Sequence, residues 1–226
     1  MPPSMTPLTV AGRGQDHPAA RAPEVRLAVG SAIAIHRDAI ARLRLQVMRE
    51  WPCLYAGAFD QAAAQLAPCV ASWRSVAVLA FDGDALVGVS TGLPLADEHE
   101  AVRAPFEAAG MDPGRIFLCR ESMLAAPWRG RGIGHRFFDE RESHARGLSG
   151  FDYTALLAVD RPDTHPRRPP FGRDSVGFWR KRGYAPHASI RVTMAWPEPG
   201  AGDARIILAM YVGWPGRPTR WVRAGS

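Results

Sequence analysis

The chain has 226 residues, of which 46% are apolar and 22% are charged, and this composition excludes a wholly disordered, collagen-like or coiled-coil protein. The formal net charge is +6, but the basic residues are spread along the chain instead of forming a patch, so nucleic acid is not expected as the main partner. No apolar run approaches the ~20 residues of a membrane span, so no membrane association is expected.

The two ends of the chain differ in composition from the rest. Residues 1–22 are rich in Pro, Ala, Gly and Ser, and are predicted to form a disordered leader. They lack the charged and apolar segments of a secretory signal, so a cytoplasmic location is expected. Residues 214–226 are predicted to be a basic tail. No linker or repeat is visible between these segments, which predicts one domain over residues 23–213.

The first half of the chain is predicted to mix strands and helices. The expected elements are a strand at 25–29, helices at 38–50 and 60–71, strands at 75–81 and 85–93, and a helix at 98–109. Asp38 is an expected N-cap for the first helix. The Asp82-Gly83 pair between the two later strands is a turn signal and predicts a β-hairpin.

The second half of the chain continues this mixed pattern. The expected elements are a strand at 116–124, a helix from about 133 to 147, a strand at 153–159, a helix from 174 or 175 to 181, and strands at 189–196 and 205–213. Gly183 is expected to end the last helix. The order as a whole predicts an α/β domain.

The three cysteines, Cys53, Cys69 and Cys119, occur without a CxxC pair or a Cys/His ligand spacing. This pattern argues against structural zinc and against a disulfide framework. No metal is therefore assigned to the chain.

The most informative segment runs from Arg129 to Gly134, between a predicted strand and a predicted amphipathic helix. Its three glycines allow backbone N–H groups to approach a ligand closely. The start of the helix adds unpaired donors and a partial positive charge, which together favour a phosphate group. The competing interpretation is a glycine-rich turn that only connects the strand to the helix.

Other phosphate-binding motifs do not fit this segment. GxxxxGK[ST] is absent, which argues against a P-loop nucleotidase. GxGxxG is also absent, and only Asp152 stands near the place of the acidic residue that a dinucleotide fold requires.

Two motifs in order carry a resemblance to a known family. Arg129-x-x-Gly132-x-Gly134 resembles the [QR]xxGx[GA] signature of the GNAT acyltransferase superfamily, and Phe178–Tyr184 looks like its FYxxxGF segment. The run from Glu121 to Phe138, followed by the second motif, looks like a bacterial branch of that superfamily. The resemblance spans about residues 25–196. It implies the α/β GNAT fold, a central mixed sheet of about seven strands with helices on both faces.

The resemblance implies an N-acetyltransferase, an acyltransferase that moves an acetyl group from acetyl-CoA to a small-molecule or peptide amine by direct attack. Backbone N–H groups of Gly130–Gly134 would hold the pyrophosphate, and the stretch Leu124–Ala126 would pair with the pantetheine arm. The cofactor-binding residues so implied are Leu124, Ala125, Ala126, Arg129, Gly130, Arg131, Gly132, Ile133 and Gly134. Members of the superfamily are often dimers, so a homodimer is expected by analogy.

Glu121 and Ser122 are the catalytic candidates. Several members of the family carry a base or a water-positioning residue on the strand before the glycine turn, where Glu121 stands. The alternative for Glu121 is a salt bridge with Arg120 or a neighbouring arginine, because unpaired burial of a carboxylate is costly. Side chains alternate along a strand, so Glu121 and Ser122 face opposite sides unless a bulge intervenes.

The acid that protonates the leaving thiolate is not identified. Trp179 stands where many members of the family have a tyrosine, and an indole N–H cannot supply a proton at neutral pH. Tyr184 matches an aromatic position that usually serves packing. The absent tyrosine supports an alternative function, a non-catalytic acyl-CoA-binding sensor. A second alternative is a nucleic-acid-binding protein that uses the excess of arginine.

Two further groups of residues are open to two interpretations. Trp51, Tyr55 and Phe59 lie where the family places its acceptor-binding loop, but such aromatic residues are as often core. The helix face with Asp139, Glu140, Arg141 and Glu142 is expected to be solvated.

Overall fold

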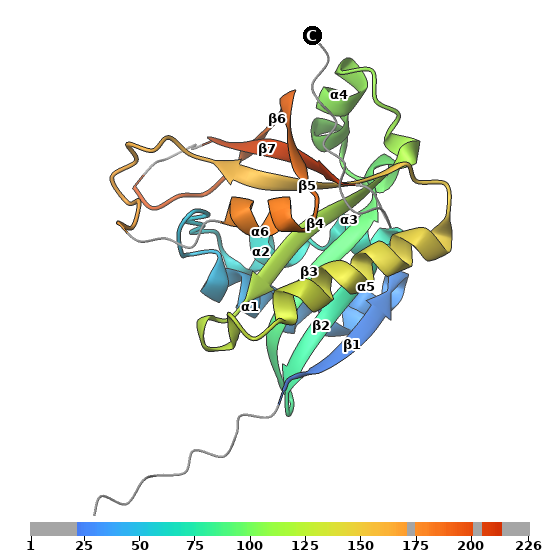
Figure 1. The fold of residues 1–226 in the computed structure, drawn as a ribbon. Coiled ribbons are helices and arrows are strands. Elements are labelled where there is room, and N and C mark those ends of the chain that lie inside the picture. Colours follow the sequence, from blue (N-terminus) through green and yellow to red (C-terminus); the bar gives the residue numbers. More distant parts are fainter. Residues whose placement is uncertain (1–21, 171–174, 201–204, 214–226) are drawn as a thin grey trace, which may run out of the picture.

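A seven-stranded mixed sheet runs through the molecule in the order β1-β2-β3-β4-β5-β7-β6 (Figure 1). The computed structural model describes residues 22–170, 175–200 and 205–213. The strands are β1 (Glu24–Val29), β2 (Val76–Asp82), β3 (Ala85–Pro94), β4 (Ile116–Leu124), β5 (Tyr153–Asp160), β6 (Ala185–Ala195) and β7 (Arg205–Gly213). Every pair of neighbours is antiparallel except β4 and β5, which are parallel. The sequence-based prediction of a mixed α/β sheet is confirmed.

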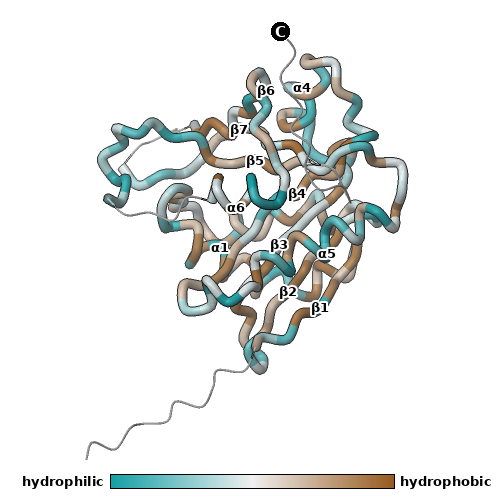
Figure 2. Tube along the Cα trace, in the orientation of Figure 1, coloured by the Kyte–Doolittle hydropathy of each residue, from teal (hydrophilic) through white to brown (hydrophobic). Residues whose placement is uncertain are grey.

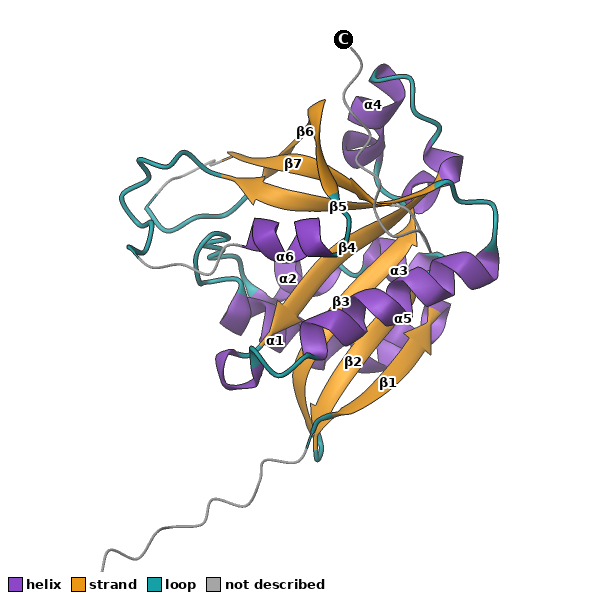
Figure 3. Ribbon diagram, in the orientation of Figure 1, coloured by secondary structure: helices purple, strands orange, loops and turns teal. Residues whose placement is uncertain are grey.

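Helices cover both faces of this sheet (Figure 3). The α-helices are α1 (Arg37–Val47), α2 (Phe59–Ala64), α3 (Ala67–Ala71), α4 (Glu100–Ala108), α5 (Ile133–Leu148) and α6 (Ser175–Lys181). The short 3-10 helices are η1 (Gly30–His36), η2 (Leu95–Asp97), η3 (Pro113–Arg115) and η4 (Ala126–Trp128). Helix α5 packs on β2, β3 and β4 from one side, and α1 and α3 pack on the sheet from the other.

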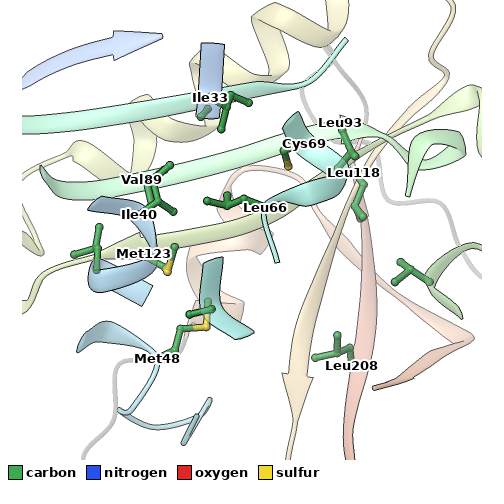
Figure 4. Packing of buried hydrophobic residues seen from close by; sticks show 14 of the residues in the cluster. Ile33, Ile40, Met48, Leu66, Cys69, Val89, Leu93, Leu118, Met123 and Leu208 are labelled. Carbon is green, nitrogen blue, oxygen red and sulfur yellow. The ribbon is translucent and has the colours of Figure 1, made fainter. Parts of the chain in front are cut away.

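The core has an apolar layer on each side of the central strands. Strand β2 is buried along almost its whole length, and its residues alternate between the two layers. Figure 2 shows apolar colouring along much of the central strands. In the larger layer, Ile33 of η1 and Ile40 of α1 pack with Val89 of β3 and Met123 of β4 (Figure 4).

The structure corrects two details of the predicted helices. The helix expected over 60–71 is two helices, because Pro68 occupies the first turn of α3 and cannot continue a preceding helix. Asp38 is not the N-cap of α1: the cap position is His36, without a side-chain hydrogen bond, and the unpredicted helix η1 precedes it. Asp38 lies instead in the first turn of α1, where the helix dipole favours a carboxylate.

The predicted hairpin and the strand at 116–124 are confirmed. The predicted tail at 214–226, and the predicted leader at 1–22 except for Ala22, lie outside the described residues. No helix in the described part of the chain is both long and apolar enough to cross a membrane.

Strand β4 changes its pairing in the middle. It pairs with β5 only over Ile116–Cys119, so β5 turns away beyond that point (Figure 1). On its other side, Thr91 of β3 pairs with Glu121 and Gly92 pairs with Cys119, which leaves Arg120 in a β-bulge. The second half of β4 therefore has a free edge next to an irregular segment.

We predict that Gly92→Ala lowers the free energy of unfolding by about 1–3 kcal/mol, the usual cost of overpacking a core. A Cβ atom at this position would lie 2.6 Å from Cε1 of the buried Phe117 ring and 3.2 Å from the carbonyl oxygen of Leu118. Urea unfolding followed by circular dichroism measures the change.

Gly147→Ala is the matched control, because no heavy atom lies within 4 Å of a Cβ there and alanine favours a helix over glycine by about 1 kcal/mol. If Gly92→Ala were as stable as the wild type, the close packing of β3 on Phe117 would be wrong.

Candidate functional site

The glycine turn joins β4 to α5 through the short helix η4. Gly130 and Gly132 have φ values of 78° and 82°, in the left-handed region that glycine adopts without strain. Gly132 is the N-cap of α5 and supplies no side-chain cap. Within the described residues, no hydrogen bond forms to the backbone N–H groups of residues 130–134. The turn thus presents a series of unused donors at the positive end of a helix.

The two arginines of this turn are held by neighbouring groups. Arg129 donates from Nε to the carbonyl oxygen of Leu124 at 2.9 Å and from Nη1 to Glu50 at 2.6 Å. Arg131 stacks over the Trp128 ring, with Cζ 4.8 Å from the ring centroid. Because Glu50 neutralises Arg129, the main contribution of Arg129 here is to fix the end of β4.

A cavity of about 250 Å³ lies where β4 and β5 diverge. Its lining comes from both faces of the sheet: Arg44 belongs to α1 and Met48 is the C-cap of that helix, whereas Phe138 and Arg141 belong to α5. The β4 residues Leu118–Ser122 and the β5 residues Leu156–Val159 form its sides.

Glu121 lies in this cavity as part of a chain of buried charges. It forms an ion pair with Arg44, and Nη1 of Arg120 lies 3.7 Å from the same carboxylate oxygen. Arg120 in turn donates from Nε to Glu98 at 2.9 Å. Burial alone would raise the pKa of Glu121, but Arg44 and Arg120 outweigh it, so the pKa is lowered and the carboxylate is ionised at neutral pH.

Ser122 lines the cavity from the opposite face of β4. The pairing with β3 is regular from Glu121 onward, so the side chains of Glu121 and Ser122 alternate. The bulge instead places the side chains of Arg120 and Glu121 on one face of β4. On that face Arg120 pairs with Glu98 and Glu121 pairs with Arg44. Ser122 is exposed, whereas Glu121 is mostly buried.

Arg44 was not among the residues that the sequence singled out. It is only 2% exposed and lies over two rings, 5.0 Å from the centroid of Tyr55 and 5.7 Å from that of Trp196. The sequence does indicate that Arg44 is buried, because it lies four residues after Ile40 and four before Met48, and all three positions fall on the buried face of α1 and its C-cap.

The prediction of a solvated helix face is wrong for Arg141, which is 1% exposed. It donates from Nε to the carbonyl oxygen of Phe137 at 3.2 Å, and from Nη1 to the carbonyl oxygens of Thr91 and Glu121, each at 3.3 Å. Ile133, Phe137, Arg141 and Ala145 recur every four residues on α5, and this spacing already places the arginine on the apolar side.

The two aromatic residues of the second motif have different positions. Trp179 lines the cavity, and its ring centroid lies 5.1 Å from that of Tyr211. Tyr184 is buried in the core: its hydroxyl lies 2.9 Å from Oγ1 of Thr154 and donates to Glu142 at 3.1 Å. Burial raises the pKa of Tyr184 well above its usual range, so this phenol stays protonated.

The three aromatic residues that follow α1 all pack against other side chains. Tyr55 is buried, with its ring centroid 5.0 Å from that of Trp196. Trp51 packs against His165 at 5.1 Å, and Phe59 packs on the larger core layer. Among the described residues, no group of three or more His, Cys, Asp or Glu side chains could hold a metal ion.

We predict that Glu121→Gln lowers the free energy of unfolding by about 3–5 kcal/mol at pH 7, because it leaves the buried Arg44 without its counterion. The folded pKa of Glu121 lies below the unfolded value. Its stabilisation is therefore present above the unfolded pKa, about 4.3, and is lost as the pH falls through the folded pKa. Urea unfolding of both proteins at pH 7, 5 and 3 should show the difference shrinking with acid.

The control is Glu140→Gln, which breaks an outer ion pair with Arg136 of 3.6 Å on α5 and should cost no more than about 0.5 kcal/mol. A loss of stability for Glu121→Gln that did not change with pH would contradict the ionised state of this carboxylate.

Solved structures supply the comparison with known proteins, whereas no family model and no curated protein matches the sequence. The protein yncA of Salmonella typhimurium with its cofactor acetyl-CoA is 10% identical, with a TM-score of 0.53 over 88% of this chain and 98% of that one. The ribosomal-protein-alanine N-acetyltransferase of Brucella melitensis is 13% identical, with a TM-score of 0.53 over 84% of this chain and 99% of that one.

A third solved structure is GphF, a GNAT-like decarboxylase in complex with isobutyryl-CoA. It is 16% identical, with a TM-score of 0.55 over 84% of this chain and 98% of that one. The shared fold therefore hosts more than one reaction, and the function has to be argued from the site. The match nevertheless extends over most of each chain, and the protein has the GNAT fold that its two sequence motifs predicted.

Proposed function

We propose that the protein is an N-acyltransferase that moves an acetyl group from acetyl-CoA to a small-molecule or peptide amine in the cytoplasm. The observation that carries the proposal is a juxtaposition. A turn with unused N–H donors leads from the free edge of β4, and that edge leads to a cavity between β4 and β5. Acetyl-CoA has three parts in the same order: a pyrophosphate that fits the turn, an amide-containing arm that fits the strand edge, and a thioester that fits the cavity.

The residues of the turn fit the pyrophosphate of acetyl-CoA. Among the described residues, the N–H groups of Gly130–Gly134 have no partners and a Cβ at Gly132 would meet no atom within 4 Å. Arg131, stacked on Trp128, adds positive charge beside it.

The free edge of β4 fits the pantetheine arm. Ala125 donates its N–H to Val87 of β3. In an antiparallel ladder the backbone groups alternate, so those of Leu124 and Ser122 point away from β3 toward the gap that β5 leaves. Arg129 already binds the carbonyl oxygen of Leu124, which leaves the rest of this edge, with Ala126 beyond it, for the amide groups of the arm.

Direct attack requires that the acceptor amine lose a proton and that the thiolate gain one. A carboxylate with a lowered pKa is a weak base, so Glu121 is proposed to order a water molecule that takes the proton. Ser122 is proposed as a polar contact for the reacting group from the other face of β4. No tyrosine lines the cavity among the described residues, so solvent is proposed to protonate the thiolate.

The alternative is a non-catalytic sensor of acyl-CoA. The position of Trp179 in the cavity favours it, because indole offers a hydrogen bond but no proton. The same glycine turn would hold the ligand in both cases, so binding alone does not separate them.

We predict that Gly132→Asp weakens the binding of CoA at least about a hundredfold, because a carboxylate in the turn repels the pyrophosphate. Calorimetric titration of CoA into both proteins measures this. Gly110→Asp is the matched control: Gly110 also has a positive φ, 75°, and open space around its Cβ, but it lies between α4 and η3. Equal binding by Gly132→Asp and the wild type would exclude the turn as the phosphate site.

We also predict that the wild type releases free thiol from acetyl-CoA when amines are added, and that Glu121→Gln lowers kcat at least about tenfold with little change in the KM for acetyl-CoA. A thiol-reactive dye follows the release across a panel of polyamines, amino acids and peptides. Tight binding of acetyl-CoA without release from any acceptor would favour the sensor.

A further inference from the structure

Arg141 is a buried cation that has no acidic partner in the described part of the chain. No carboxylate of the described residues lies within 4 Å of its guanidinium, and Nη2 has no hydrogen-bond partner among them. Its three hydrogen bonds go to backbone carbonyl oxygens, at 3.2–3.3 Å. A buried charge with such incomplete pairing is costly unless a ligand completes it.

The cavity as a whole has an excess of positive charge. Arg44, Arg120 and Arg141 line it, against the carboxylates of Glu98 and Glu121. Both carboxylates are already engaged by Arg44 and Arg120. The excess therefore resides on Arg141, on the α5 side of the cavity.

The position of Arg141 matches the reacting end of the donor. Its Nη1 binds the carbonyl oxygen of Glu121, which lies three residues before Leu124 along β4. At about 3.3 Å per residue of extended strand, Glu121 therefore lies about 10 Å from Leu124, the end of β4 nearest the glycine turn. A group that enters at the turn and follows β4 meets Arg141 beyond its amide portion.

We infer that Arg141 recognises a carboxylate on a molecule that reacts in this cavity, an inference that rests on the proposed function. The carboxylate belongs either to the acyl group of the donor, as in a dicarboxylic acyl-CoA, or to the acceptor, as in an α-amino acid. A guanidinium is suited to this task because its donors form a planar fork that fits a carboxylate. Arg141 then determines specificity and takes no part in proton transfer.

A structural role predicts something different. If Arg141 only supports the bulge through the carbonyl oxygens of Thr91 and Glu121, its replacement changes stability alone. The preference for carboxylated over neutral ligands therefore distinguishes the two roles of Arg141, whereas stability and overall activity do not.

The experiment compares carboxylated and neutral ligands in two arms, after CoA itself has been shown to bind. In the first arm, succinyl-CoA and butyryl-CoA, which have equal acyl length, are titrated by calorimetry. In the second arm, kcat/KM with acetyl-CoA is measured for a panel of α-amino acids and for their amides. The arm that shows a preference identifies which molecule carries the carboxylate.

We expect the wild type to prefer the carboxylated ligand at least about tenfold in one arm, the order expected for a hydrogen-bonded charge pair. Arg141→Gln should reduce this preference to about twofold or less, and Arg141→Lys should retain part of it. Arg146→Gln, which removes an exposed arginine from the same helix, should leave it unchanged. Thermal unfolding monitors all variants, and Arg141→Lys carries the comparison if Arg141→Gln does not fold.

Equal affinity for charged and neutral ligands in both arms, or a preference that survives Arg141→Gln, would overturn the inference. Failure of the wild type to bind CoA would instead overturn the proposed function, so the two failures are distinguishable.

Discussion

The parting of β4 from β5 after Cys119 is the constraint on which the rest of the molecule depends. A strand that loses its neighbour halfway along has backbone N–H and C=O groups without partners, and these groups need other donors and acceptors. Here the bulge at Arg120 shifts the register, Arg141 binds the carbonyl oxygens of Thr91 and Glu121, and Arg129 binds that of Leu124. Arg129 thus serves the edge that faces the gap, whereas Arg141 stabilises the bulge between β3 and β4 beside it.

The buried charges follow from the same gap. Arg44, Glu121, Arg120 and Glu98 alternate in sign through the interior, so each charge has at least one opposite neighbour. Such a chain is tolerated in a low-dielectric interior only when its geometry is complete, and removal of one member leaves an uncompensated charge. The ionised Glu121 is consequently both a feature of the cavity and a requirement for the stability of the strands around it.

Much of the architecture could be predicted from the sequence because local patterns carry it. Two β-rich runs and the Asp82-Gly83 turn between them indicate the β2–β3 hairpin, and glycines at 130, 132 and 134 indicate the turn before α5. The role of an arginine on an apolar helix stripe is harder to predict, since its partners lie far away in the chain. Arg44 meets Glu121 across 77 residues, and Arg141 meets Thr91 across 50. The spacing of four residues predicts burial, but only the folded chain shows which charge or carbonyl oxygen is the partner.

The cavity is lined from both faces of the sheet, by Arg44 and Met48 on one side and by Phe138 and Arg141 on the other. A molecule held in this gap can therefore be contacted by side chains from both faces of the sheet. For a reaction between a donor and an acceptor, this geometry suits a ternary complex, in which both are bound before any bond is made. In the proposed acyl transfer, each partner would then meet a different set of side chains, Arg44 on the α1 side and Arg141 on the α5 side.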